Sequence, residues 1–283
     1  MKRVVTIQDV SCIGKCSATV ALPIISVTGS ECAVIPTAVL STHTMFQGFT
    51  FRDLTCDIKP IAEHWQKENM VFDAIYTGYL GSFEQLQLVS EFIDMFRTEK
   101  NSVIIDPVMA DNGKLYPGFT PEFAVAMGKL CGKADVIVPN LTEAAFMLEE
   151  PYCGSGYDEE WVKGLLKRLS GLGAKNVVLT GISFHPGELG VMGYNAEKDE
   201  YFCYFHRRLD ASFHGTGDIF ASTAVGAYVQ GLPLLDSLKI AADYTVECMD
   251  ITLKNPDHVT YAVEFEKAIP YLVSRMQKSL QVI

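Results

Sequence analysis

The chain contains the segment Phe213-His214-Gly215-Thr216-Gly217-Asp218-Ile219-Phe220-Ala221-Ser222, in which two glycines flank a threonine and an aspartate precedes an apolar run. The run continues to Val229 with small and apolar residues, which predicts a buried helix. Gly215-Thr216-Gly217-Asp218 should therefore be a loop that enters a helix N-terminus. Free backbone N–H groups and the helix dipole favour negative charge there. We expect this segment to bind a phosphate and Asp218 to accept a proton from an attacking alcohol.

This pattern alone is weak evidence for catalysis. A Gly-x-Gly turn before a helix is common, and aspartate is frequent at helix N-termini because of the dipole. The remaining sequence must therefore decide between a structural turn and a phosphate site.

The composition favours a single large α/β domain. The chain has 283 residues, of which 48% are hydrophobic, and a formal net charge of −11. That charge, without a long basic run, argues against nucleic acid or an anionic membrane as a partner. The eight cysteines form no zinc or C-x-x-C pattern, and the N-terminus resembles no signal peptide. We therefore expect free thiols, a cytoplasmic location and one domain over residues 1–283.

Strand and helix patterns alternate along the chain. The strands are predicted at 4–8, 32–36, 72–76, 103–107, 136–140 and 177–181, with an antiparallel edge pair at 187–194 and 201–206. The helices are predicted at 17–27, 61–69, 83–98, 121–129, 142–148, 161–172, 219–230, 235–254 and 263–276. Continuous apolar strands separated by helices predict a three-layer α/β sandwich, with a mostly parallel central sheet covered by helices on both faces and a small edge β-hairpin.

Polar residues follow the predicted strands. Ligands of open parallel sheets bind outside the carboxyl ends of the strands. We therefore expect one cleft to gather Asp9, Tyr79, Asp106, Asn140, Glu143, Thr180 and Asp218.

The chain lacks a P-loop and a dinucleotide-binding G-x-G-x-x-G after its first strand. A phosphoryl transferase without these motifs still needs phosphate donors, a metal and a proton acceptor. Carboxylates at Asp106, Asp111 and Glu143 can hold Mg²⁺ directly or through water. The alternative for Asn140 and Glu143 is a helix capping pair, which is equally consistent with their spacing.

Six segments together resemble the ribokinase-like superfamily and, within it, the pyridoxal kinases. They occur in the family's order over almost the whole chain. The segments are Ile7-Gln8-Asp9 with Gly14, Ser41-Thr42-His43-Thr44, Thr77-Gly78-Tyr79-Leu80, Asp106-Pro107-Val108-Met109-Ala110-Asp111, Pro139-Asn140-Leu141-Thr142-Glu143 and Gly215-Thr216-Gly217-Asp218.

The resemblance implies an ATP-dependent kinase that phosphorylates the 5′-hydroxymethyl group of pyridoxal, pyridoxine or pyridoxamine. It implies Mg²⁺, a monovalent cation such as K⁺, a homodimer and a flap at about 111–120. The implied catalytic residues are Asp218 as the base and Gly215, Thr216 and Gly217 as the anion hole. The implied substrate-binding residues are Asp9, Ser11, His43, Thr44, Met45, Tyr79 and Asp218. The implied ATP-binding residues are Asp106, Asp111, Asn140, Glu143, Thr180 and His206, of which Asp106, Asp111 and Glu143 also serve the metal.

The chain departs from the family pattern at three positions. Asp9 stands where relatives commonly have serine, Met45 where some have glutamine, and Ala110 where glycine is common. An acid at position 9 can bind a protonated ring nitrogen or a cationic substituent, which leaves the preferred vitamer open.

Other functions remain as alternatives. A hydroxymethylpyrimidine kinase acts on a similar alcohol, but such enzymes typically carry a cysteine within the anion-hole turn, where this chain has Thr216-Gly217. A sugar or nucleoside kinase is expected to show a Gly-Gly-x-x-x-Asn pattern near the N-terminus, which is absent. A non-catalytic vitamin-binding module on the same fold would not need the intact Asp218.

Overall fold

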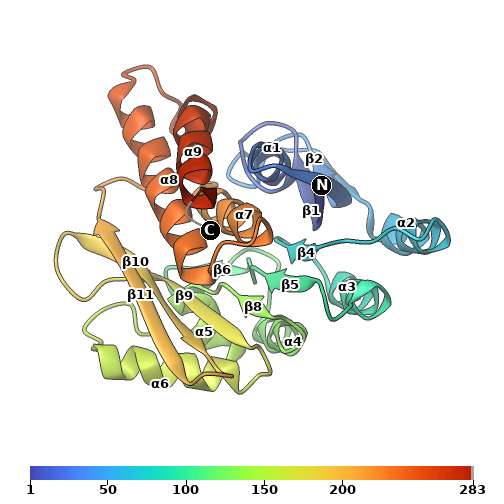
Figure 1. The fold of residues 1–283 in the computed structure, drawn as a ribbon, viewed down its shortest axis with the longest axis horizontal. Coiled ribbons are helices and arrows are strands. Elements are labelled where there is room, and N and C mark those ends of the chain that lie inside the picture. The colour runs from blue at the N-terminus through green and yellow to red at the C-terminus, as the bar shows by residue number, and fades with distance from the viewer. Residues whose placement is uncertain (282–283) are drawn as a thin grey trace. The chain divides into compact units, whose positions relative to one another are not determined.

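The computed structural model describes residues 1–281, and its internal contacts divide the chain into two compact units. Unit 1 combines Met1–Ala74 with the chain from Leu209 onward, and unit 2 comprises Ile75–Arg208. Figure 1 shows unit 1 in the blue and red colours of the two chain ends and unit 2 in green to yellow. The predicted loop and helix around Asp218 belong to unit 1.

Unit 1 contains a short sheet with the order β1-β2-β3. Its strands are β1 (Lys2–Ser11), β2 (Ser30–Leu40) and β3 (Phe51–Asp53). β1 pairs parallel with β2, and β3 pairs antiparallel with β2. Residues 4–9 of β1 are buried, as expected for a strand covered on both faces. The predicted first strand is correct but too short, because β1 continues through a β-bulge at Gln8–Val10.

Five helices complete unit 1. They are α1 (Ala18–Val27), α2 (Thr55–Lys67), α7 (Thr216–Val229), α8 (Leu234–Lys254) and α9 (Phe265–Leu280). Helix α7 packs against α1 and α8, and α8 packs against α9 (Figure 1). Their apolar side chains form one buried cluster that includes Ile24, Ile219, Tyr244 and Leu272. This packing holds the start of α7 in place.

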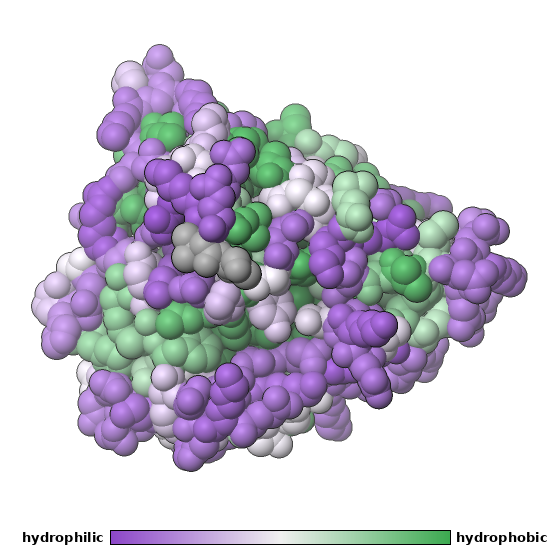
Figure 2. Space-filling view, in the orientation of Figure 1, coloured by the Kyte–Doolittle hydropathy of each residue, from purple (hydrophilic) through white to green (hydrophobic). Residues whose placement is uncertain are grey.

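Unit 2 contains a sheet with the order β11-β10-β9-β8-β5-β4. The strands are β4 (Ala74–Thr77, which begins at the boundary of the units), β5 (Ser102–Ile105), β8 (Val136–Ile137), β9 (Asn176–Ile182), β10 (Glu188–Asn195) and β11 (Glu200–Arg207). β5, β8 and β9 are parallel, and β10 pairs antiparallel with both β9 and β11. The predicted edge hairpin is therefore correct. Figure 2 shows a pale to green, apolar surface over β10 and β11.

The helices of unit 2 are α3 (Phe83–Phe96), α4 (Pro121–Cys131), α5 (Leu141–Met147) and α6 (Glu159–Ser170). A separate two-stranded hairpin, β6 (Ala110–Asp111) and β7 (Lys114–Leu115), begins the segment predicted as a flap. Ser82, Thr120 and Asp158 cap α3, α4 and α6 with their side chains. No helix within residues 1–281 is both long and apolar enough to cross a membrane.

Candidate active site

The N-terminus of α7 is shaped by Gly215. This residue is the N-cap and has a left-handed backbone, with φ 81°. A Cβ there would lie 2.3 Å from the carbonyl oxygen of Lys15, so only glycine fits. The first N–H bonded into the helix is that of Ile219, which donates to the Gly215 carbonyl at 3.0 Å. The preceding N–H groups, at Thr216, Gly217 and Asp218, begin the helix, and the binding of an anion by Thr216 and Gly217 stays a prediction.

Asp218 lies in the first turn of α7 and is partly exposed. Desolvation by the surrounding protein raises the pKa of its carboxyl to about 7, while a hydrogen bond from the Ser17 backbone N–H opposes this rise and Asp9 adds to it. A carboxyl that titrates near neutral pH is well matched to general-base work. The position and the electrostatics therefore suit the predicted proton acceptor.

Asp9 lies at the end of β1 beside the same helix start. Its side chain is buried, with 5% exposed, and Ser11 Oγ donates to Asp9 Oδ2 at 3.1 Å. Burial raises the pKa of Asp9, and the hydroxyl groups of Ser17 and Ser11 oppose the rise. The structure thus brings together Asp9, Ser11 and Asp218, three of the predicted site residues, within unit 1.

The residues predicted to bind substrate in the loop after β2 differ in their exposure to solvent. Thr44 and Met45 are exposed, whereas His43 is buried, with 2% exposed. Both ring nitrogens of His43 have protein partners: Nε2 lies 3.2 Å from the Tyr261 carbonyl oxygen, and the Met45 N–H donates to Nδ1 at 3.3 Å. His43 is therefore arranged to support the loop, and its predicted contact with substrate stays a prediction.

In unit 2, Asn140 and Glu143 form a reciprocal capping box at the start of α5. Asn140 Oδ1 accepts from the Glu143 N–H at 2.9 Å, and Glu143 Oε2 accepts from the Asn140 N–H at 2.9 Å. Glu143 Oε1 also accepts from the Met109 N–H at 3.2 Å. Burial raises the pKa of Glu143 to about 8 despite these bonds. The capping alternative is thus observed, and a metal role for Glu143 stays a prediction.

The other residues predicted for ATP surround this box. Asn140 Nδ2 donates to the Ala110 carbonyl at 2.8 Å, next to Asp111, and Asn140 forms a parallel β-bridge with Thr180. Asp111 is exposed on the β6–β7 hairpin, and its charge contributes to the raised pKa of Glu143. Asp106 directly follows β5 and is mostly buried. The structure therefore brings Asp111, Asn140, Glu143 and Thr180 together.

The oxygen donors in this group suit a hard cation such as Mg²⁺, which keeps several of its waters. Because backbone N–H groups occupy both Glu143 oxygens, contact through water fits that residue better than direct ligation. Within residues 1–281, no group of three or more His, Cys, Asp or Glu side chains is arranged to enclose a metal ion by itself.

Two further predicted residues, Tyr79 and His206, make other contacts. The ring of Tyr79 lies 5.4 Å from that of Phe119, between centroids, so it contacts the predicted flap segment. His206 lies on the edge strand β11, where its Nδ1 is 2.9 Å from the Arg207 carbonyl oxygen. This contact is with a neighbour on the same strand, so the predicted role of His206 toward ATP stays a prediction.

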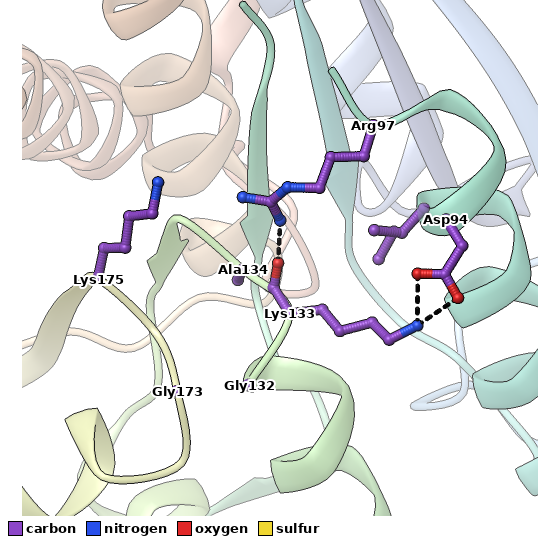
Figure 3. Close-up of a pocket in the computed structure, with 8 residues that line it drawn as sticks. Asp94, Arg97, Gly132, Lys133, Ala134, Gly173 and Lys175 are labelled. Atoms are coloured by element: carbon purple, nitrogen blue, oxygen red, sulfur yellow. Dashed lines mark hydrogen bonds and ion pairs between the residues drawn. The ribbon is translucent and has the colours of Figure 1, made fainter. Parts of the chain in front are cut away.

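A cavity of about 220 Å³ lies elsewhere in unit 2. Its lining residues are Ile93, Asp94, Arg97, Gly132, Lys133, Ala134, Gly173 and Lys175. Figure 3 shows the ammonium group of Lys133 against the carboxylate of Asp94. Outside the residues drawn there, Asp135 pairs with both Arg97 and Lys175. Residues 132–134 and 173–175 directly precede β8 and β9, whereas Asn140 and Thr180 lie toward the carboxyl ends of these strands. The cavity is therefore distinct from the candidate site.

Ser17 is a site residue that sequence reasoning missed. The sequence placed it only as the first residue of the predicted helix 17–27; it does occupy the N-cap position of α1, but its side chain makes no capping hydrogen bond. It contacts Asp9 and Asp218 instead. No sequence signal distinguishes this use of a serine from ordinary capping.

An open helix N-terminus with an acid in its first turn, carried on an α/β scaffold, is the arrangement expected of a kinase that transfers a phosphoryl group to an alcohol. Residues 54–261 match the family model described as phosphomethylpyrimidine kinase. The chain therefore belongs to the phosphomethylpyrimidine kinase family.

Solved structures agree with this assignment. A Bacteroides thetaiotaomicron protein named "putative phosphomethylpyrimidine kinase" is 39% identical, with a TM-score of 0.92 over 96% of this chain and 93% of that one. Pyridoxal kinase from Lactobacillus plantarum is 27% identical, with a TM-score of 0.88 over 97% of both chains. These likenesses confirm the predicted α/β class, with its mostly parallel sheet, surrounding helices and small hairpin.

A Schizosaccharomyces pombe protein named "putative pyridoxal kinase" is 28% identical over 212 residues. The match covers 71% of this chain and 60% of that protein. The chain thus spans less than two thirds of this relative's length.

Proposed function

We propose that this protein transfers the γ-phosphoryl group of ATP to the 5′-hydroxymethyl group of vitamin B6 compounds: pyridoxal, pyridoxine or pyridoxamine. The observation that carries the proposal is the start of α7. There Gly215 opens the helix N-terminus, and Asp218 sits in its first turn with a pKa raised to about 7. A helix N-terminus that can bind a phosphate, with a proton acceptor beside it, supplies two of the parts that phosphoryl transfer to an alcohol needs.

In the proposed reaction, the Asp218 carboxylate accepts the proton of the hydroxymethyl group as its oxygen bonds to the γ-phosphorus. The bond from phosphorus to the bridging oxygen of ADP breaks, and ADP leaves. The N–H groups of Thr216 and Gly217 stabilise the charge on the transferring phosphoryl oxygens. In unit 2, Asp111, Asn140 and Thr180 are proposed to bind ATP, and Asp106 with Asp111 would hold a hydrated Mg²⁺ that neutralises phosphate charge.

The relatives support a B6 substrate. The Bacteroides thetaiotaomicron structure was also solved in a form with pyridoxal, with a TM-score of 0.90 and 39% identity. The Lactobacillus plantarum and Schizosaccharomyces pombe relatives carry pyridoxal kinase names. Thr216-Gly217, where hydroxymethylpyrimidine kinases typically carry a cysteine, favours the same substrate class.

We also propose a requirement for Mg²⁺ and K⁺, a homodimeric state and a cytoplasmic location. The resemblance to pyridoxal kinases supports the first three. The eight cysteines, which are all free within the described structure, support a reducing compartment. Light scattering during size exclusion tests the dimer, and a cation series in the activity assay tests the ion requirements.

A coupled assay of ADP release over pyridoxal, pyridoxine and pyridoxamine tests the main proposal. We expect turnover with at least one of them, together with a 5′-phosphate product seen by mass spectrometry. The absence of turnover with all three, while ATP binds, would refute it. 5′-Deoxypyridoxal serves as the matched control, since it lacks the accepting hydroxyl group.

Hydroxymethylpyrimidine phosphorylation is the second candidate. The family to which the chain belongs and the name of its 39% identical Bacteroides thetaiotaomicron relative favour it. Including hydroxymethylpyrimidine in the same assay separates the two candidates by their ratio of kcat/KM.

A further inference from the structure

Asp9 and Asp218 are joined through a single residue of unit 1. The backbone N–H of Ser17 lies close enough to Asp218 to lower its pKa, and the Ser17 hydroxyl group acts on the pKa of Asp9 in the same way. Because the N and Oγ atoms of one serine are close neighbours, the two carboxyl groups are neighbours as well. Each carboxyl also contributes to the electrostatics of the same buried thiol, Cys16. A substrate whose hydroxyl group meets Asp218 therefore presents an adjoining group to Asp9.

Ser17 adopts an unfavourable backbone conformation to make this bridge. Its φ is 52° and its ψ is −135°. Residues other than glycine rarely adopt this combination of backbone angles. It also forgoes the capping bond that a serine normally makes at the N-cap position. Strain of this kind persists only where the surrounding structure fixes it, and it concentrates at functional sites.

The acid pair has no cationic partner among the described residues. The groups that act on Asp9 are hydroxyl and backbone groups, and those that act on Asp218 are the Ser17 N–H and Asp9 itself. The nearest lysine in sequence, Lys15, pairs instead with Glu266 at 2.8 Å. A buried carboxylate normally needs a positive partner, because burial without one is costly.

A further polar group of α7, the Ser222 hydroxyl group, also lacks a partner among the described residues. Ser222 is fully buried, and its Oγ has no hydrogen-bond partner in the described structure. It lies one turn after Asp218 in α7, and helical side chains lean toward the N-terminus of their helix. The described structure therefore leaves a buried hydroxyl group without a hydrogen-bond partner in the turn after Asp218.

We infer that Asp9 selects substrates that carry an amine on the ring carbon next to the one bearing the reacting hydroxymethyl group. This inference rests on the proposed function and names the preferred substrate class of that site. Among B6 compounds, pyridoxamine has such a group, an aminomethyl that is positively charged at neutral pH. Pyridoxine has a neutral hydroxymethyl there, and pyridoxal has an aldehyde. The charged amine supplies the cation that the Asp9–Asp218 pair lacks.

The expected effect is a difference in kcat/KM. A hydrogen bond to a charged group contributes enough free energy to change a binding constant about 10- to 100-fold. The wild-type protein is therefore expected to prefer pyridoxamine over pyridoxine by that factor. Asp9→Asn keeps the shape of the side chain and removes its charge, so it should lower kcat/KM for pyridoxamine about 10- to 100-fold more than kcat/KM for pyridoxine, whatever common effect the variant has on Asp218. Glu31→Gln, an exposed acid at the start of β2, is the matched control and should leave the ratio unchanged.

Calorimetry and a second variant test the same inference about Asp9. Calorimetry without ATP should show that Asp9→Asn weakens the binding of pyridoxamine by a larger factor than that of pyridoxine. Asp9→Ser provides a smaller neutral side chain if the asparagine variant does not fold. Equal losses for pyridoxamine and pyridoxine, or a wild-type ratio near one, would overturn the inference while the kinase function stands. No turnover of any B6 compound by the wild-type protein would overturn both.

Discussion

The imidazole rings of His43 and His214 lie 4.2 Å apart between centroids and are inclined by 38°. Phe46 packs against His43 at 5.0 Å, and Tyr261 contacts both His43 and Phe46. His214 directly precedes Gly215, so this aromatic cluster connects the loop around residue 43 to the start of α7. Gly14 is held against the same ring, because a Cβ at Gly14 would lie 2.0 Å from His43 Cδ2. The turn predicted to bind an anion is therefore positioned by packing from distant segments.

The histidine pair should make the protein less stable in acid. Burial, with a smaller effect of His43, lowers the pKa of His214 to about 4, below its ordinary value of 6.5. Between these values the unfolded chain binds a proton that the folded protein does not. Stability therefore falls as the pH drops from about 6.5 to 4. We expect His214→Phe, which keeps an aromatic ring, to flatten this part of a plot of Tm against pH.

His185→Phe, at an exposed histidine of unit 2, is the matched control for this exchange. If Tm falls equally steeply with decreasing pH in His214→Phe and in the wild-type protein, the result contradicts this account.

The two glycines of the turn should respond differently to alanine. Gly215 has a positive φ, and its Cβ would lie 2.3 Å from the Lys15 carbonyl oxygen, whereas a Cβ at Gly217 would meet nothing within 4 Å. Gly215→Ala should lower the free energy of unfolding by about 1–3 kcal/mol. Gly217→Ala lies inside the helix and should cost nothing or stabilise by up to about 1 kcal/mol. Urea unfolding of both variants tests the contrast, and equal losses would show that the turn is not tightly held.

Glu143→Gln separates the structural and metal roles of this residue. Burial raises the pKa of Glu143 to about 8, so the folded protein retains a proton that the unfolded chain has lost. Stability due to this group is present at acid pH and is lost as the pH rises to about 8. Relative to the wild-type protein, Glu143→Gln should therefore be more stable at pH 9 than at pH 5.

The same variant reports on the cation. If Glu143 holds Mg²⁺ through water, Glu143→Gln should raise the Mg²⁺ concentration needed for half-maximal activity. Glu122→Gln, in the first turn of α4, is the matched exposed control. An unchanged Mg²⁺ requirement would leave Glu143 with its capping role alone.

Prediction from the sequence was most accurate for features that depend on residues close together in the chain. The alternation of strands and helices, the edge hairpin and the capping of α5 by Asn140 follow from periodicity and short-range hydrogen bonding. The three-residue strand β3 was missed, because Phe51–Asp53 is too short and exposed to show a pattern. The stacking of His43 on His214 and the bridge made by Ser17 join segments that are distant in sequence, and local propensity carries no record of them. These long-range contacts are also what place the candidate catalytic groups.

Asp218 supplies the most direct test of the mechanism. Asp218→Asn keeps the size of the side chain but cannot accept the substrate proton. We expect kcat to fall about 10²- to 10⁴-fold with little change in the KM for ATP, because the loss concerns proton transfer. In the wild-type protein the carboxyl must be ionised to act, and its pKa is raised to about 7. Activity should therefore decline about tenfold for each pH unit below 7 and reach a plateau above it.

Asp57→Asn, in the first turn of α2, is a matched control in unit 1 and should keep wild-type rates. Turnover by Asp218→Asn within about tenfold of the wild-type value would exclude Asp218 as the base. A pH profile that stays flat from pH 5 to 8 would instead mean that proton transfer by this carboxyl does not limit the reaction. Because Asp218→Asn also removes a carboxylate from desolvated surroundings, its Tm should exceed that of the wild-type protein above pH 7. This gain in stability, accompanied by lost activity, is expected only of an acid that serves catalysis at the expense of the fold.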